Sequence, residues 1–110
     1  MEPKILKSDQ LDIIRAVRAN LLEFMERNES PWVGLCSLFS DVIDDKYKVY
    51  IGYETIMDYI PLFTRSNAIK HANGYRSSTY WWGSSLNFAR YDFTNRILFL
   101  DWIESQLVKQ

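Results

Sequence analysis

Apolar residues recur at three- and four-residue steps near both ends of this chain, and this periodicity constrains the fold more than any other feature. Near the N-terminus they form one stripe along a predicted helix: Leu11, Ile14, Val17, Leu21, Phe24 and Met25. Ser8 or Asp9 can cap that helix, because either side chain can accept from free N–H groups of its first turn. The stripe of the last predicted helix consists of Phe93, Ile97, Leu100, Ile103 and Leu107. Leu98, Phe99 and Trp102 widen it.

The middle of the chain adds shorter elements. Ser30 and Pro31 suit the N-cap and the first position of another helix, where proline loses no hydrogen bond. The apolar residues of this helix cover more than a narrow stripe, which predicts a central position: Val33, Leu35, Cys36, Leu38, Phe39, Val42 and Ile43. Residues 47–53 are rich in β-formers, so a short strand is the alternative there to the helix expected over residues 51–60. A short helix is expected around residues 66–72.

Together these elements predict a single, mainly α domain over residues 1–110. It is a compact domain of about four helices with an irregular aromatic segment, and one short β-hairpin is the alternative to an all-helical arrangement. A chain of 110 residues buries enough surface for independent folding. We expect one core that draws on three helices: Leu11, Ile14, Val17, Leu21, Leu35, Cys36, Leu38, Phe39, Ile97, Leu100 and Ile103.

Composition argues against several classes of protein. No apolar run approaches the length needed to cross a bilayer, and the N-terminal residues lack the apolar region and cleavage site of a signal peptide. The single cysteine, Cys36, cannot form an internal disulfide. A cytoplasmic location is therefore expected, with no membrane partner.

The net charge of −1 hides an asymmetry along the chain. Residues 1–64 carry seven basic and eleven acidic residues, whereas residues 65–96 carry five basic residues and one acid. Duplex nucleic acid is not expected as a partner, because its binders concentrate basic residues on one face and this chain is slightly acidic overall. The basic part either complements the acidic part within the fold or faces an acidic partner.

The basic part overlaps an aromatic segment. Eight of the 23 residues from Tyr80 to Trp102 are aromatic. If the backbone around the adjacent Trp81 and Trp82 is extended, the two indoles face opposite sides, so one of them is exposed or used in binding. From Phe93 onward the helical period places the apolar side chains in the core, whereas the residues before it follow no regular period.

Catalytic chemistry has little support in the sequence. His71 is the only histidine, and Cys36 lies in an apolar pattern that predicts an inert buried thiol. One cysteine and one histidine do not complete a zinc site. Asp41 and Asp45 share a predicted helix face, as pairs of solvated carboxylates commonly do. We therefore assign no catalytic residue, no metal and no cofactor, and expect that the protein is not an enzyme.

Binding is the better prediction for the aromatic and basic segment. Tryptophan, tyrosine and arginine dominate protein-interface hot spots, and the same residues stack on nucleobases and hold phosphate. The candidate binding residues are Arg76, Tyr80, Trp81, Trp82, Arg90, Tyr91 and Arg96. Arg96 has an alternative role, because it lies inside the last predicted helix and can instead join that helix to a carboxylate such as Asp41 or Asp45.

Three short elements occur together in a known group of proteins: Gly34-Leu35-Cys36, Tyr80-Trp81-Trp82, and Arg96 followed by Phe99-Leu100. In this combination, over about residues 34–103, the chain resembles small phage-encoded proteins of uncharacterised function. Those proteins often have proline after the aromatic triplet, where this chain has Gly83. The resemblance implies a viral accessory protein that acts inside a bacterium, and it implies no reaction and no catalytic residues.

Two hypotheses for the function follow. The first is a non-enzymatic phage-type protein that binds and inhibits a host protein, such as a component of an anti-phage defence. The second is a protein that sequesters an anionic small molecule, such as a signalling nucleotide. The aromatic surplus also predicts a homo-oligomer, since exposed apolar patches usually mark contacts.

Overall fold

The computed structural model describes residues 4–27, 35–49, 51–52, 55–72 and 91–109, with the backbone alone for residues 91–93. These residues form five helices: α1 (Lys7–Glu26), α2 (Leu35–Tyr47), α3 (Ile56–Tyr59), α4 (Arg65–His71) and α6 (Tyr91–Lys109). The predicted mainly α class is confirmed. None of the described residues is in a strand, so neither the β-hairpin nor the short strand at residues 47–53 has support in the described part of the chain.

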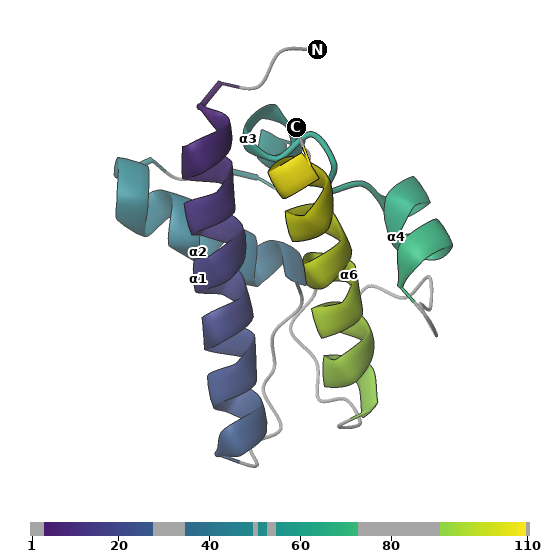
Figure 1. Cartoon of the computed structure of the whole chain (residues 1–110). Coiled ribbons are helices and arrows are strands. Elements are labelled where there is room, and N and C mark those ends of the chain that lie inside the picture. The colour runs from purple at the N-terminus through teal and green to yellow at the C-terminus, as the bar shows by residue number, and fades with distance from the viewer. Residues whose placement is uncertain (1–3, 28–34, 50, 53–54, 73–90, 110) are drawn as a thin grey trace.

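The helices are arranged around an antiparallel pair. α1 and α6 run side by side in opposite directions and make the most extensive contact among the described helices (Figure 1). α2 crosses behind this pair and packs against α1, and α4 flanks α6 on the side away from α1 (Figure 1). The front of the α1–α6 pair is not covered by any described element (Figure 1).

The core lies between this pair and α2. α1 contributes Ile13, Ile14, Val17 and Leu21, and α2 contributes Leu35, Cys36, Leu38, Phe39 and Ile43. α6 contributes Phe99, Leu100, Ile103 and Leu107. Three helices from distant parts of the sequence thus close one cluster, as the helical periods predict.

Two members of the predicted core are only partly buried. Ile97 and Leu11 pack against the core from its edge, while Phe99 and Arg96 of α6 are fully enclosed. α6 contacts α4 as well as α1, and this second contact turns the buried arc of α6 toward Phe99 and away from Ile97. The predicted stripe for α6 was therefore centred too far toward α1.

The helix ends also differ in detail from the prediction. α1 begins at Lys7 with Leu6 as its N-cap, so Ser8 and Asp9 lie inside the first turn and neither is the cap. Asp9 still suits the positive end of the helix dipole. The predicted cap at Ser30 and Pro31 lies outside the described residues.

The two shorter helices, α3 and α4, lie within or close to their predicted ranges. α4 spans Arg65–His71, as expected to within a residue, and the Thr64 hydroxyl caps it by accepting from the Asn67 N–H at 3.0 Å. The helix expected over residues 51–60 is the single turn of α3. None of the helices in the described ranges is long and apolar enough to cross a membrane.

Candidate functional site

Most of the residues predicted to bind a partner lie outside the described part of the chain. These are Arg76, Tyr80, Trp81, Trp82 and Arg90. Tyr91 is the first residue of α6, and its side chain also lies outside the description. The structure therefore locates the two ends to which this segment connects, α4 and α6, and leaves the binding role of the segment as a prediction.

Arg96 is the one predicted binding residue whose side chain is described. It is 1% exposed and is the largest of the fully buried side chains among the described residues. It shares the inner face of α6 with Phe99 and Leu100. An enclosed guanidinium cannot reach a partner across the surface, so its position favours the alternative structural role.

An aromatic ladder connects the core to the surface beside α4. Phe39 of α2 contacts Phe63, with ring centroids 4.2 Å apart, and Phe63 stacks on Phe99 of α6 at 5.9 Å. Phe99 lies 6.2 Å from Trp102, whose indole is stacked on the exposed ring of His71 at 3.8 Å and 8°. This ladder fixes the C-terminal end of α4 on α6, at the point from which the undescribed aromatic segment continues.

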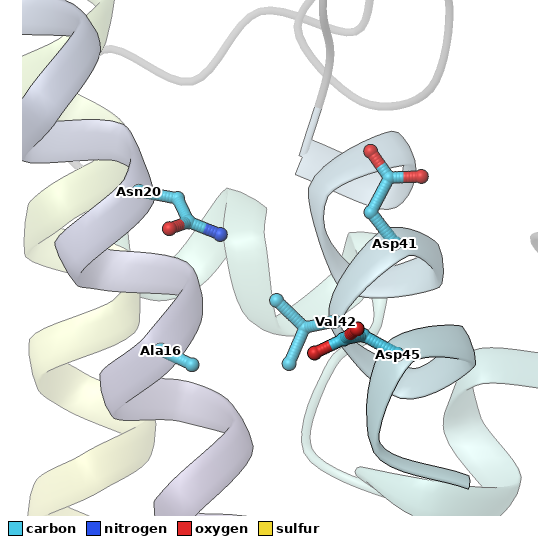
Figure 2. Close-up of a pocket in the computed structure, with 5 residues that line it drawn as sticks. All are labelled: Ala16, Asn20, Asp41, Val42 and Asp45. Atoms are coloured by element: carbon cyan, nitrogen blue, oxygen red, sulfur yellow. The ribbon is translucent and has the colours of Figure 1, made fainter. Parts of the chain in front are cut away.

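A shallow pocket lies between α1 and α2. It has a volume of about 280 Å³ and is lined by Ala16, Asn20, Asp41, Val42 and Asp45. Asn20 extends from α1 toward α2, and Val42 and Asp45 extend back toward α1 (Figure 2). Partial burial, and secondly the nearby Asp44 carboxylate, raise the pKa of Asp41 above its usual value. The pocket is acidic and suits a cationic group better than an anionic one.

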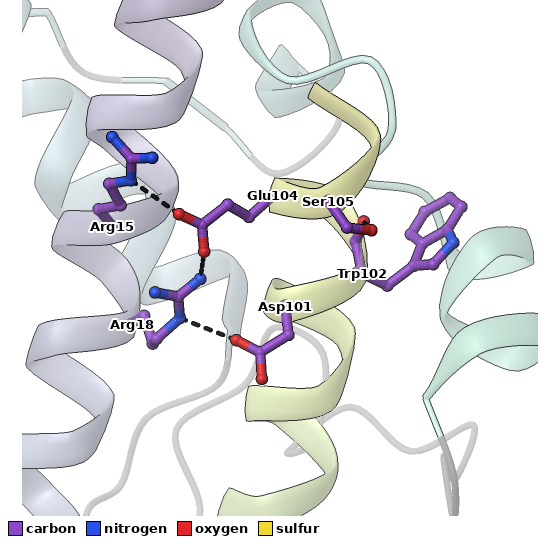
Figure 3. Close-up of polar contacts among 6 residues, drawn as sticks. All are labelled: Arg15, Arg18, Asp101, Trp102, Glu104 and Ser105. Carbon is purple, nitrogen blue, oxygen red and sulfur yellow. Dashed lines mark hydrogen bonds and ion pairs between the residues drawn. The ribbon is translucent and has the colours of Figure 1, made fainter. Parts of the chain in front are cut away.

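Four charged side chains join α1 to α6. The Arg15 Nε lies 2.7 Å from Glu104 Oε2, and the Arg18 Nε lies 3.0 Å from Asp101 Oδ1 (Figure 3). Arg18 also contacts Glu104. Arg15 and Asp101 are each about half exposed, at 54% and 53%, whereas Arg18 and Glu104 are mostly covered. The arrangement gives each arginine a carboxylate on the neighbouring helix.

The sequence contains a signal for this cluster that the predictions above did not use. Arg15 and Arg18 are three residues apart beside the apolar stripe of α1, and Asp101 and Glu104 have the same spacing in α6. Residues three apart share a helix face. Two such pairs of opposite sign flanking two apolar stripes predict an interhelical ion-pair cluster.

The thiol of Cys36 is not placed for nucleophilic chemistry. Cys36 is fully buried, and desolvation raises the pKa of its thiol to about 12 despite an opposing effect of Arg65. A protonated thiol is a poor nucleophile. No group of three or more potential metal ligands occurs among the described residues.

Comparisons with protein-family models, with curated proteins and with solved structures gave no match to this chain. The function is therefore argued from its residues and geometry.

Proposed function

We propose that this protein is a non-enzymatic, phage-type accessory protein that acts in the bacterial cytoplasm by binding and inhibiting a host protein. The observation that supports this best is the stack of His71 on Trp102, because it fixes α4 on α6. The basic aromatic segment, residues 73–90, joins these two helices in sequence. Anchored ends reduce the conformational entropy that a binding segment loses when it engages a partner.

The chemistry of the described residues supports binding over catalysis. The thiol of Cys36 is buried and its pKa is raised, and the arginines and carboxylates at the α1–α6 contact are engaged with one another. The basic aromatic segment supplies tryptophan, tyrosine and arginine, which are the residue types that anchor protein interfaces. The resemblance to small phage-encoded proteins supports a host target.

A protein partner is favoured over a small anion by the charge of the described pocket. Asp41 and Asp45 line it, and a site of this sign repels a nucleotide phosphate. An anion site would instead draw on the arginines of the basic aromatic segment. Sequestration of an anion is therefore the alternative outcome of the test below.

The test is native mass spectrometry of the protein purified from bacterial cells, followed by reconstitution with each retained component. We expect a host protein to be retained, and Arg76→Ala and Arg90→Ala to weaken its binding without changing the melting temperature. Lys48→Ala is the matched control, since Lys48 is exposed at the end of α2 and pairs with Asp45, away from the start of α6.

Three results would contradict the proposal. Retention of a small anion in place of a protein would favour sequestration. Normal binding by both Arg76→Ala and Arg90→Ala would remove the basic aromatic segment from the interface. Equal weakening by Lys48→Ala would show a general charge effect.

A further inference from the structure

The face of the α1–α6 pair that no described element covers has apolar residues at both ends. The ion pairs set the register, because Arg15 lies level with Glu104 and Arg18 with Asp101 (Figure 3). One turn beyond them, at the C-terminal end of α1, lie Leu22 and Leu98, which are 40% and 41% exposed. One turn beyond the pairs in the other direction lie Leu11, which is partly buried, and Val108, which is 61% exposed.

The middle of this face is charged, and the two signs are on different helices. α1 carries Arg15 and Arg18, and α6 carries Asp101 and Glu104. Arg15 and Asp101 are about half exposed at 54% and 53%, so each keeps surface that its own chain does not cover. The face is thus a positive stripe beside a negative stripe, with an apolar patch above and below.

Small side chains border the two stripes. Ala19 on α1 and Thr94 and Ser105 on α6 are all exposed. Short side chains allow another helix pair to approach to the usual interaxial distance of about 8–10 Å. A surface that carries the two stripes in reversed order, as a second copy of this face does, complements both of them.

We propose that this face binds a second copy of the same chain, related by a two-fold axis parallel to α1 and α6. Rotation about that axis lays α1 of each copy over α6 of the other and preserves the level of every residue. Arg15 then faces the acidic stripe of the second copy, and Leu22 meets Leu98 of the second copy. The two helix pairs form a four-helix arrangement with neighbours of opposite charge.

Charge selects this axis over the other two-fold arrangement. A two-fold axis perpendicular to the helices and in the plane of the face would lay α1 on α1 and α6 on α6. Arginine would then face arginine and carboxylate would face carboxylate, which is repulsive. That arrangement would also place Leu22 opposite Leu11 of the second copy, and this difference makes the two arrangements distinguishable.

The size of the face fits a reversible dimer. A helix of 20 residues, the length of α1, is about 30 Å long, and two adjacent helices are about 20 Å wide. Each copy would therefore bury about 600 Å², or about 1,200 Å² in total, which is at the low end for specific interfaces. The dimer is independent of the host-binding function, because its residues lie outside the basic aromatic segment.

The first test replaces exposed apolar residues by glutamate. Val108→Glu and Leu22→Glu should each raise the dimer dissociation constant by about tenfold or more, measured by sedimentation equilibrium up to about 100 µM, since each buries an unpaired charge. Ile69→Glu is the matched control: Ile69 is 63% exposed on α4, away from the face, and its change should leave the constant within about twofold. A wild-type protein that is monomeric throughout, or a dimer that these three changes affect equally, would overturn the proposal.

The second test separates the two arrangements with a short bis-maleimide cross-linker. Leu22→Cys protein mixed with Leu98→Cys protein should give a cross-linked dimer, and a mixture of Leu22→Cys with Leu11→Cys protein should give little. The native thiol does not interfere, because Cys36 is buried. Preferential cross-linking of the Leu22→Cys and Leu11→Cys mixture would show the perpendicular axis and overturn the proposed one.

Discussion

Arg96 occupies a position of α6 that faces the core, where an apolar side chain is usual. It is 1% exposed and lies on the same face as the fully buried Phe99 and Leu100. Removing a guanidinium from water costs several kcal/mol unless the interior supplies compensating contacts. Because Arg96 is enclosed among core residues, its side chain contributes to how α6 packs on the rest of the molecule.

This burial predicts a large effect of Arg96→Ala on stability. The change removes a large side chain from a filled site and leaves the group that it contacts without its partner. We therefore expect the free energy of unfolding to fall by about 3–5 kcal/mol. The melting temperature should then fall by more than about 10 °C in a domain of this size. Arg27→Ala, at a half-exposed position, should change it by only a few degrees. Comparable melting temperatures for the two variants, measured by circular dichroism, would place Arg96 outside the structural framework.

Cys36 predicts a pH dependence of stability. Its pKa in the folded protein is about 12, against an ordinary value of 9.0. Below pH 9 the thiol is protonated in both states and has no effect. Above pH 9 the unfolded chain loses the proton while the folded chain keeps it, so stability falls as pH rises. Between pH 8 and pH 10.5 the wild type should lose about 2 kcal/mol more than Cys36→Ala in urea unfolding. An equal loss in both proteins would mean that the thiol is already accessible to water.

At the level of the helices, local periodicity predicted where the long helices lie in the sequence but not how each one is rotated against its neighbours. α1 and α6 follow from apolar spacing within a few residues, and α4 lies within a residue of its expected range, whereas the predicted cap of α1 was wrong. The rotation of α6 did not follow, because it depends on α4, and the pattern within one helix does not show which neighbours it will have. The same limit explains why Ile97 was assigned to the core and Phe99 to its margin.

The end of α2 offers a test at this scale. Lys48 follows the helix with φ of 58°, in the left-handed region, and its N–H donates to the Asp44 carbonyl at 2.7 Å. A side chain with a Cβ costs about 1 kcal/mol in this conformation, and glycine does not. Allowing for the greater entropy of an unfolded glycine, Lys48→Gly should stabilise the protein by about 0.5 kcal/mol in urea unfolding. Lys48→Ala keeps the Cβ and should give no gain, so equal stabilities for the two variants would refute this account.

At the scale of the whole molecule, the candidate site was predictable in composition but not in position. The charge asymmetry and the aromatic surplus single out the basic aromatic segment from sequence alone. Which side chains of that segment face outward depends on packing, and an aperiodic stretch carries no signal for it. The α1–α6 face shows the complementary case. The sequence shows its charged residues. It does not show that they form one surface, because this depends on the packing of two helices from opposite ends of the chain.

The pairing of the first and last helices predicts that the fold needs both ends of the chain. α6 buries Phe99, Leu100, Ile103 and Leu107. At about 1.5–3 kcal/mol each, these side chains contribute about 6–12 kcal/mol, comparable with the whole stability of a domain, which is about 5–15 kcal/mol. A chain that ends at residue 90 should therefore show no cooperative thermal transition by circular dichroism, and a synthetic peptide of residues 91–110 should restore it.

The matched control for this truncation is a chain that ends at Leu107. It loses residues 108–110, of which Val108 and Lys109 are exposed, and keeps every side chain of α6 that is described as buried, so its melting temperature should stay within a few degrees of the wild type. A cooperative transition in the chain ending at residue 90 would show that α1 and α2 bury enough between themselves. In that case α6 would be an attachment to the core and not a part of it, and its outer face could not hold the geometry on which the proposed dimer depends.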